Sequence, residues 1–138
     1  MDAWFAGHGD ARTRVEAVVV SCGPDVSVCF GGGEGPHIGA VALGIPRPSL
    51  MDHSAPSASA SVLCVTGHKE DELAREAALK LATTLGCRVS VSVGLHVDDA
   101  TPADIRDMAE NHRIVLAQVI ELLRDERGHE SEGESHVG

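Results

Sequence analysis

Three histidines stand where strand-like runs begin or end, and imidazole is the side chain best suited to metal binding and proton transfer at neutral pH. His37 opens one apolar run, His68 follows a second, and His96 follows a third. The second and third runs are joined by a helical segment long enough for a parallel crossover, so their carboxyl ends should share one sheet edge. His37 joins them if its strand runs antiparallel to the second run. The sequence therefore predicts one pocket there, although three independent strand-end histidines would give the same pattern.

A single glycine joins the second run to the helical segment, in the sequence Gly67-His68-Lys69-Glu70. The first amides of a helix have no partner within the helix, and the helix dipole is positive at that end, so a phosphate or carboxylate is favoured there. Lys69 would add a full positive charge. We therefore expect an anion at this junction, while a plain turn followed by a solvated lysine and dipole-complementing acids is the simpler interpretation.

The same three histidines could instead hold a divalent metal ion, with Glu34, Glu70 or Asp98 as general base on a bound water. No two histidines of the sequence have the four-residue spacing of a helical zinc motif. Three ligands from distant parts of a chain cannot be recognised from spacing alone. A small metal-dependent enzyme using His37, His68 and His96 is thus the alternative to a ligand-binding pocket.

The elements that must position these residues follow the order of three strands, a fourth strand, a helix, a fifth strand and a second helix. The strand-like runs are 14–22, 26–30, 37–45, 61–66 and 88–93, and the helical segments are 69–85 and 101–127. Gly86 is the expected C-terminal cap of the first helix, and Thr101 and Pro102 are start signals of the second. This order predicts a single α+β domain, in which a mainly antiparallel sheet of about five strands is covered by two helices, with one parallel strand-helix-strand crossover.

The predicted domain spans residues 14–127. Residues 1–13 show no periodicity and are expected to form a mobile or weakly docked N-terminal arm. Residues 47–60 are rich in proline and serine and are expected to form a long loop. Residues 128–138 are acidic and polar, which predicts a disordered tail after a helix that frays near Arg127. His112 lies on the apolar face of the second helix, where a partly buried structural role is expected.

The composition excludes several classes of function. The chain has 138 residues, with 11 Lys plus Arg against 21 Asp plus Glu and a formal charge of -10, so nucleic acid is not an expected partner. No apolar run is long enough to span a membrane and the N-terminus does not resemble a secretory signal, so a cytoplasmic protein is expected. The cysteines lack a C-x-x-C spacing and are expected to be reduced core residues: Cys22, Cys29, Cys64 and Cys87.

Three motifs carry a likeness to a known family, and they occur in the order Gly35 to Ala42, Gly67 to Ala74 and Val93 to Asp98. With these motifs the chain resembles the gallate decarboxylase D-subunit family over roughly residues 14–127. Members of that family are regarded as chaperones of prenylated flavin mononucleotide that serve large aromatic-acid decarboxylases. The resemblance implies an accessory protein, not an enzyme, that binds prenylated FMN or FMN and matures or delivers it to a partner decarboxylase.

The resemblance also gives the histidine and glycine positions an expected role. The cofactor phosphate would lie at the helix start after Gly67, and the ring would lie against Gly39, aliphatic side chains and imidazoles, or between two subunits of a homodimer. The expected cofactor-binding residues are His37, Gly39, Gly67, His68, Lys69, Glu70 and His96. Aromatic residues for stacking are scarce, which suits a carrier that must release its ligand. A structural subunit without any ligand is the remaining alternative.

Overall fold

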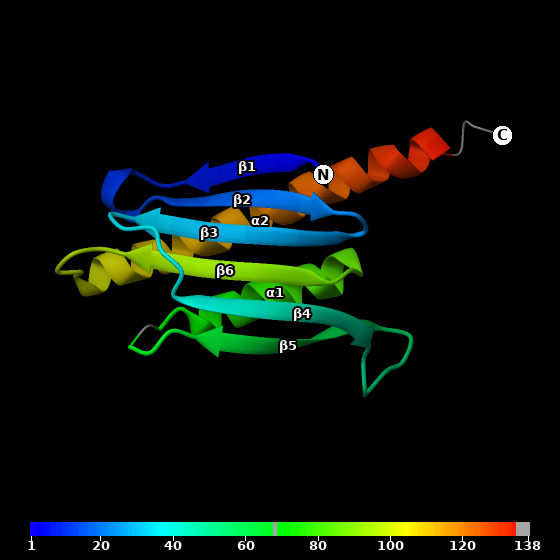
Figure 1. Cartoon of the computed structure of the whole chain (residues 1–138), viewed down its shortest axis with the longest axis horizontal. Coiled ribbons are helices and arrows are strands. Elements are labelled where there is room, and N and C mark those ends of the chain that lie inside the picture. The colour runs from blue at the N-terminus through cyan, green and yellow to red at the C-terminus, as the bar shows by residue number, and fades with distance from the viewer. Residues whose placement is uncertain (68, 135–138) are drawn as a thin grey trace.

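Six strands and two helices make up the computed structural model, which describes residues 1–67 and 69–134 (Figure 1). The strands are β1 (Ala3–His8), β2 (Val15–Cys22), β3 (Asp25–Gly33), β4 (Ala40–Pro48), β5 (Pro56–Cys64) and β6 (Val89–His96). The helices are α1 (Asp71–Leu85) and α2 (Pro102–Glu134), and a short 3-10 helix, η1 (Ala11–Thr13), follows β1. The strand order is β1-β2-β3-β6-β4-β5. The predicted α+β fold is confirmed.

Strand directions place three chain segments at one edge of the sheet. All neighbouring strands are antiparallel except β3 and β6, which run parallel. Since β4 is antiparallel to both β5 and β6, the latter two run in the same direction, and the connection between them through α1 is the predicted parallel crossover. The carboxyl ends of β5 and β6 therefore lie at the edge where β4 begins, as the sequence predicted.

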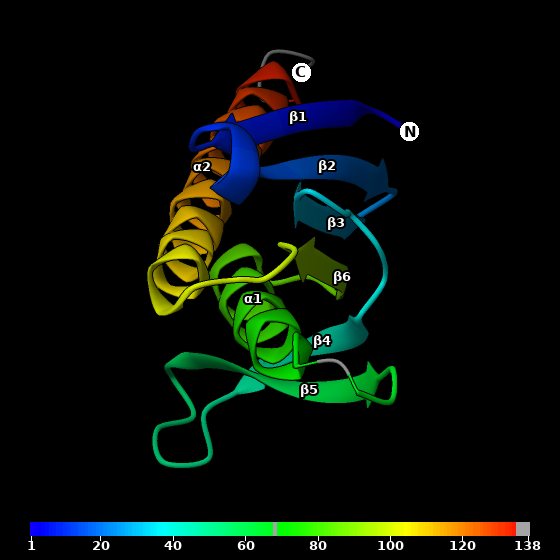
Figure 2. The ribbon, with the colours of Figure 1, turned by 90° about the vertical axis from the view of Figure 1, so that its left-hand side faces the viewer.

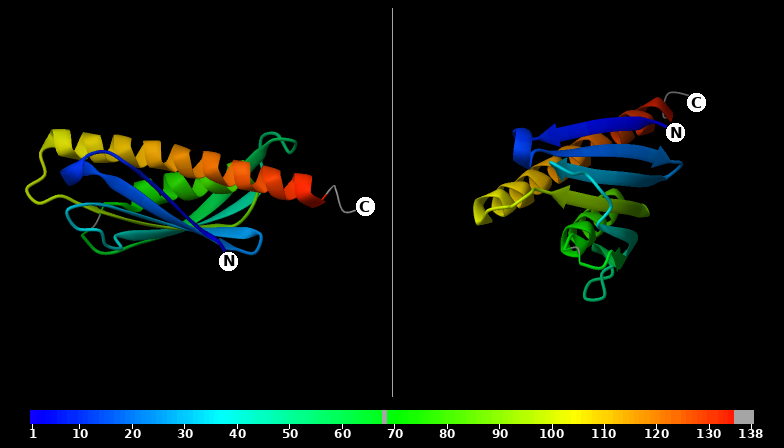
Figure 3. Two further views of the ribbon diagram at one scale, coloured as in Figure 1. Left: turned by 90° about the horizontal axis from the view of Figure 1, so that it is seen from above. Right: turned by 60° about the vertical axis from the view of Figure 1, so that its left-hand side comes forward.

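Both helices pack on the same face of the sheet and leave the other face uncovered (Figures 2 and 3). The alternation along β6 shows why, because Val89, Val91 and Val93 are buried while the serines between them face the uncovered side. Burial of one such valine stabilises the fold by about 1.5 to 3 kcal/mol. α1 buries mainly alanines, and it approaches β4 so closely that a Cβ atom at Gly44 would overlap the Ala78 carbonyl oxygen.

Helix boundaries follow the predicted capping residues. Gly86 adopts the left-handed conformation after α1, with φ of 65°, and its amide donates to the Ala82 carbonyl. At the start of α2, the Thr101 hydroxyl accepts from the Asp104 amide at 3.1 Å and the Asp104 carboxylate accepts from the Thr101 amide at 3.0 Å. This reciprocal pair of bonds satisfies two amides at the helix start, including one of the first turn. Within the residues that the structure describes, neither helix has the length and hydropathy needed to cross a bilayer.

The two ends of the chain are more regular than the sequence predicted. The expected N-terminal arm contains β1, which pairs with β2 from Ala3 to His8, and Trp4 packs against the core. The strand was missed because Gly7 and His8 break the alternation. α2 runs to Glu134, beyond the predicted end near Arg127, because the flanking charged residues are good helix formers and Gly128 costs only about 1 kcal/mol. The last four residues of the predicted tail, 135–138, lie outside the described residues.

The predicted loop over residues 47–60 is only partly right, because half of it belongs to strands: β4 continues to Pro48 and β5 begins at Pro56, and residues 49–55 form the loop between them. Prolines lack the amide hydrogen that an internal strand needs, so these residues indicated a loop. The pairing of β4 with β6 ends at Gly44, however, and from Pro46 onward β4 has a neighbour on one side only. The prolines therefore interrupt no ladder on the β6 side.

The cysteine prediction is also only partly right. None of the four cysteines forms a disulfide bond, but only Cys87 is buried in the core, while Cys22, Cys29 and Cys64 are exposed. Apolar composition of a strand does not show which of its two faces is covered. Half of the positions in each strand point to the face that the helices leave open.

Candidate functional site

The predicted sheet edge brings two of the three histidines together. His37 lies in the segment between β3 and β4, and His96 is the last residue of β6. Their ring centroids are 6.4 Å apart and the rings meet edge to face, with an interplanar angle of 79°. His68 lies outside the described residues, so the predicted three-histidine pocket is described here by this pair alone.

Two glycines allow the segment carrying His37 to lie across the open face of the sheet. Gly31 of β3 and Gly94 of β6 are paired in register, and neither has a side chain to hold the segment away. Pro36 lies over Gly31, 3.1 Å from the position of a Cβ atom, and the His37 carbonyl lies directly against Gly94. Figure 2 shows this segment passing on the side away from the helices. The backbone path that positions His37 therefore depends on both glycines.

His37 uses both ring nitrogens in hydrogen bonds. Nδ1 lies 2.9 Å from the carbonyl oxygen of Gly35, which can only accept, so Nδ1 carries a hydrogen. Nε2 lies 2.9 Å from Oε1 of Glu70, whose side chain is 10% exposed. A proton must lie between these two atoms, so the pair is either an imidazolium with a carboxylate or an imidazole with a carboxylic acid. A metal ion could bind His37 only after the ring gave up one of these partners.

Glu70 belongs to the start of α1, which begins at Asp71 and not at Lys69 as predicted. Glu70 occupies the N-cap position, and its carboxylate makes no capping bond to the helix amides because it points to His37. Gly39 makes room for it, since a Cβ atom there would overlap the carboxylate. Lys69 is exposed directly before the helix, and Asp71 and Glu72 follow in its first turn. Among the described residues of this helix start, Lys69 is cationic while Glu70, Asp71 and Glu72 are acidic.

A network around Arg12 ties the histidine segments to the rest of the edge. Nε2 of His96 lies 2.9 Å from the Asp98 carboxylate. Oε1 of Glu34 accepts from the Asp98 amide at 3.1 Å and from Arg12 at 3.2 Å, and Arg12 also donates to the Asp98 carbonyl at 2.7 Å and to Asp104 at 3.1 Å. Exposed ion pairs contribute at most about 1 kcal/mol each, so this network mainly orders the segments. Its bonds lower the pKa of Asp104, through the Thr101 amide first and Arg12 next.

Arg12 is the residue of this edge that the sequence did not indicate, because it lies in the expected arm and in no motif. Glu34 and Asp98, which were candidates for a general base, are both engaged in this network. Within the described part of the chain, no group of three or more His, Cys, Asp or Glu side chains is arranged to hold a metal ion. The metal-dependent alternative therefore gains no support from the geometry.

Exposed aliphatic side chains border this polar cluster. The Val65 amide donates to the Gly39 carbonyl at 2.8 Å, which holds the chain after β5 against the start of β4. Ile38, Leu63 and Val65 are 59%, 79% and 47% exposed. This end of the sheet thus combines an exposed lysine and the first amides of α1, two imidazoles and an aliphatic border with the carboxylates of Glu70, Asp71 and Glu72.

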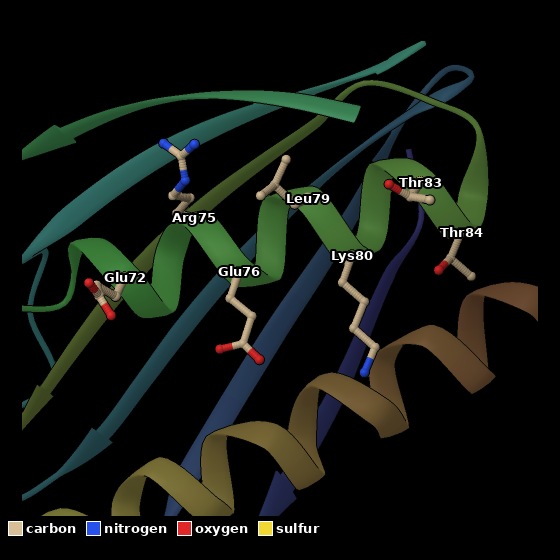
Figure 4. Close-up of a pocket in the computed structure, with 7 residues that line it drawn as sticks. All are labelled: Glu72, Arg75, Glu76, Leu79, Lys80, Thr83 and Thr84. Carbon is tan, nitrogen blue, oxygen red and sulfur yellow. The ribbon is translucent and has the colours of Figure 1, made fainter. Parts of the chain in front are cut away.

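A hollow of about 630 Å³ lies elsewhere, along α1 (Figure 4). Its walls include Arg75, Glu76, Leu79 and Lys80, whose side chains extend outward without converging on one point. Binding sites for small molecules combine an apolar cavity with a few convergent polar groups. The hollow lacks such a group, so we favour the sheet edge with His37 and His96 as the candidate site.

Comparison with known proteins gives one family and one related fold. The family model described as prenylated flavin chaperone LpdD-like domain matches residues 9–124. No curated protein matches the chain. A chain in the crystal structure of a novel chaperone complex for yeast 20S proteasome assembly superposes with a TM-score of 0.54 at 15% sequence identity, over 91% of this chain and 98% of that one. At this identity the second likeness shows the fold alone.

Proposed function

Because the chain belongs to the family of prenylated flavin chaperone LpdD-like domains, we propose that it binds prenylated flavin mononucleotide and matures or delivers it to a partner aromatic-acid decarboxylase. Membership of a chaperone family supports a non-enzymatic accessory protein with a flavin-related ligand. The match over residues 9–124 is the observation that carries the proposal. It includes all of α1, α2 as far as residue 124, and every residue of the candidate site.

The groups at the sheet edge support a binding mode for the cofactor. The phosphate is held at the start of α1 by Lys69 and the first helix amides. The imidazole rings of His37 and His96 contact the ring system, and Ile38 and Val65 shield its apolar side. The Glu70 carboxylate holds the His37 ring in position through Nε2. Gly67 and His68 complete the phosphate end in this proposal.

The site is suited to release as much as to binding. Of the aromatic residues, Phe30 is buried in the core, and Trp4 and Phe5 lie in β1 at the opposite side of the sheet. No aromatic ring of the described residues therefore stacks on a ligand at the His37 edge. A carrier transfers its cofactor only if the recipient binds it more tightly, because a ligand moves toward the state of higher affinity. An exposed aliphatic border gives that weaker binding.

The proposal is tested with a decarboxylase reconstituted in the presence and absence of this protein. The apo-decarboxylase, prenylated flavin and the aromatic acid substrate are combined, and carbon dioxide release is followed. We expect a higher rate or yield of active decarboxylase with the protein present, and no turnover of the acid by the protein alone. The protein co-expressed with a flavin prenyltransferase should also purify with flavin absorbance. Turnover by the protein alone, or an unaffected decarboxylase, would contradict the proposal.

The phosphate position leads to a prediction for Lys69. Lys69→Ala should weaken flavin binding about 10-fold to 100-fold, because loss of a charge-assisted contact removes about 1.5 to 3 kcal/mol. The measurement is a fluorescence titration of the purified variant with FMN or prenylated FMN. Lys80→Ala is the matched control, since Lys80 is an exposed lysine of α1 that lies more than two turns from the helix start. Equal affinities of the two variants would place the phosphate away from the start of α1.

A further inference from the structure

The open face of the sheet carries no charge across its centre. One row of residues in register crosses all six strands, and its members are Phe5, Val18, Cys29, Ser92, Val41 and Leu63. The next row runs from Ala3 to Ser61 through Val20, Ser27, Ser90 and Leu43. Neither row contains an Asp, Glu, Lys, Arg or His, although 23% of the chain is charged. We call these two rows the neutral face.

The neutral face is exposed and largely apolar at its two sides. Phe5 and Leu63 are 74% and 79% exposed, and Val18, Val41 and Leu43 are about half as exposed. A sheet with one face in water usually places polar or charged residues on that face. The centre is lined by small side chains, with the Ser27 and Ser90 hydroxyls hydrogen-bonded at 2.8 Å. Large apolar side chains this exposed on an uncovered sheet face indicate a surface that another molecule covers.

We propose that the neutral face is the surface on which two copies of this chain associate, sheet against sheet. A twofold axis brings the same patch of both copies together, so a patch with net negative charge would meet a second negative patch. A chain of net charge -10 therefore associates with itself with the least repulsion through a face without acids. A basic partner protein would be recognised by acidic residues, and those lie elsewhere, as in Asp71 and Glu72 of α1. Anionic lipid would be repelled by the same net charge.

The packing of the two sheets follows from the residue sizes. Sheets stacked face to face lie about 10 Å apart, and side chains of both inner faces fill the space between them. The aliphatic residues of β4 and β5 and the aromatic and aliphatic residues of β1 and β2 supply the bulk at the two sides. The serines and Cys29 in the centre let the backbones approach. The two helices of each copy remain on the outside, as Figure 2 shows for one copy.

This inference concerns association of the chain with itself and does not depend on the proposed cofactor, so its test uses protein free of flavin and decarboxylase. The test is sedimentation equilibrium of the full-length chain. We expect twice the chain mass of 14.4 kDa. Val18→Glu and Leu43→Glu should each weaken the dimer about 100-fold or more, because the twofold axis places two buried carboxylates in the interface. Both side chains are partly exposed in the single chain, so each variant can fold, as circular dichroism verifies.

Ile105→Glu is the matched control, because Ile105 is 60% exposed on α2, on the other side of the sheet. It should leave the mass unchanged. Raising NaCl from about 20 mM to about 500 mM should strengthen the wild-type dimer, since salt screens the repulsion between two acidic copies. A monomeric wild type overturns the proposal. This holds even if the neutral-face variants no longer bind a decarboxylase, because the face would then bind that partner and not a second copy. A dimer that Val18→Glu and Leu43→Glu leave intact overturns it as well.

The native thiols give a second measurement without any substitution. Cys29 lies in the centre of the neutral face, whereas Cys64 ends β5 beside the candidate site, and both are exposed in the single chain. Alkylation of Cys29 by a bulky maleimide should slow at least about 10-fold when the chain is concentrated enough to associate. Alkylation of Cys64 should change much less, and Leu43→Glu should abolish the protection of Cys29. Equal rates for Cys29 at low and high concentration of a dimeric wild type would place the interface elsewhere.

Discussion

Replacing Gly94 with alanine is expected to lower the free energy of unfolding by about 3 kcal/mol, because the added methyl group would occupy the place of the His37 carbonyl oxygen. The obstacle is backbone and not the flexible end of a side chain. Either the segment before β4 must lift from the sheet or β6 must shift away from it. Both movements separate His37 from Glu70, so the variant should also lose most of its affinity for flavin.

Urea unfolding followed by circular dichroism measures the first effect, and flavin titration at a temperature where the variant is folded measures the second. Gly128→Ala is the control, because Gly128 lies in α2 and the new methyl group would meet no atom within 4 Å apart from its chain neighbours and the nearby helix backbone. It should raise the stability slightly, by up to about 1 kcal/mol, since alanine favours the helix. If Gly94→Ala unfolds at the same urea concentration as the wild type, the segment does not lie against β6 as described.

Much of the fold could be predicted because single strands and helices are encoded in local patterns. The alternation of valine and serine from Val89 to Val93 identifies a strand with one buried face, and Gly86 and Thr101 mark helix ends through their own backbone and side-chain chemistry. The crossover through α1 followed from its length, since a parallel return needs such a connection. These signals depend on neighbours in the sequence, so one chain is enough to read them.

The parts that the sequence did not show depend on contacts between distant residues. Pro46 and Pro48 indicated a loop because the local sequence does not show that β4 pairs with β6 only as far as Gly44. Beyond that point a proline can face away from the pairing with β5. Arg12 joins the edge only because η1 lies beside the start of α2, where Asp104 is held. The bond between Glu70 and His37 could not be recognised either. It forms only because the segment that carries His37 crosses the glycines of β3 and β6.

The second large effect is expected on acidification and originates from His112 in α2. Its side chain is fully buried, its ring centroid lies 4.7 Å from that of Phe30, and within the described residues neither ring nitrogen has a hydrogen-bond partner. Burial lowers the pKa of His112 from 6.5 to about 4, and the positive charge of Arg113 acts in the same direction. The sequence predicted a structural role for this residue, and with a pKa of about 4 the buried imidazole is neutral at neutral pH.

A lowered pKa makes the folded state lose stability as the pH falls. Below pH 6.5 the unfolded chain binds a proton at His112 while the folded chain does not, until the pH approaches about 4. The contribution of this residue to the free energy of unfolding should therefore fall by about 3 kcal/mol between these values and then level off. The measurement is urea unfolding at a series of pH values.

His112→Leu removes this term and two polar nitrogens without partners, so it should raise the stability at neutral pH by about 1 kcal/mol and flatten the pH dependence between 6.5 and 4. Leucine loses the ring contact with Phe30, which limits the gain at neutral pH but does not affect the slope. His53→Leu is the control, because it removes an exposed histidine and leaves His112 in the core. In this variant the free energy of unfolding should depend on pH as it does in the wild type. If His112→Leu keeps the wild-type slope, the acid sensitivity of this protein resides in other groups, and the buried imidazole takes up its proton in the folded state as readily as in the unfolded one.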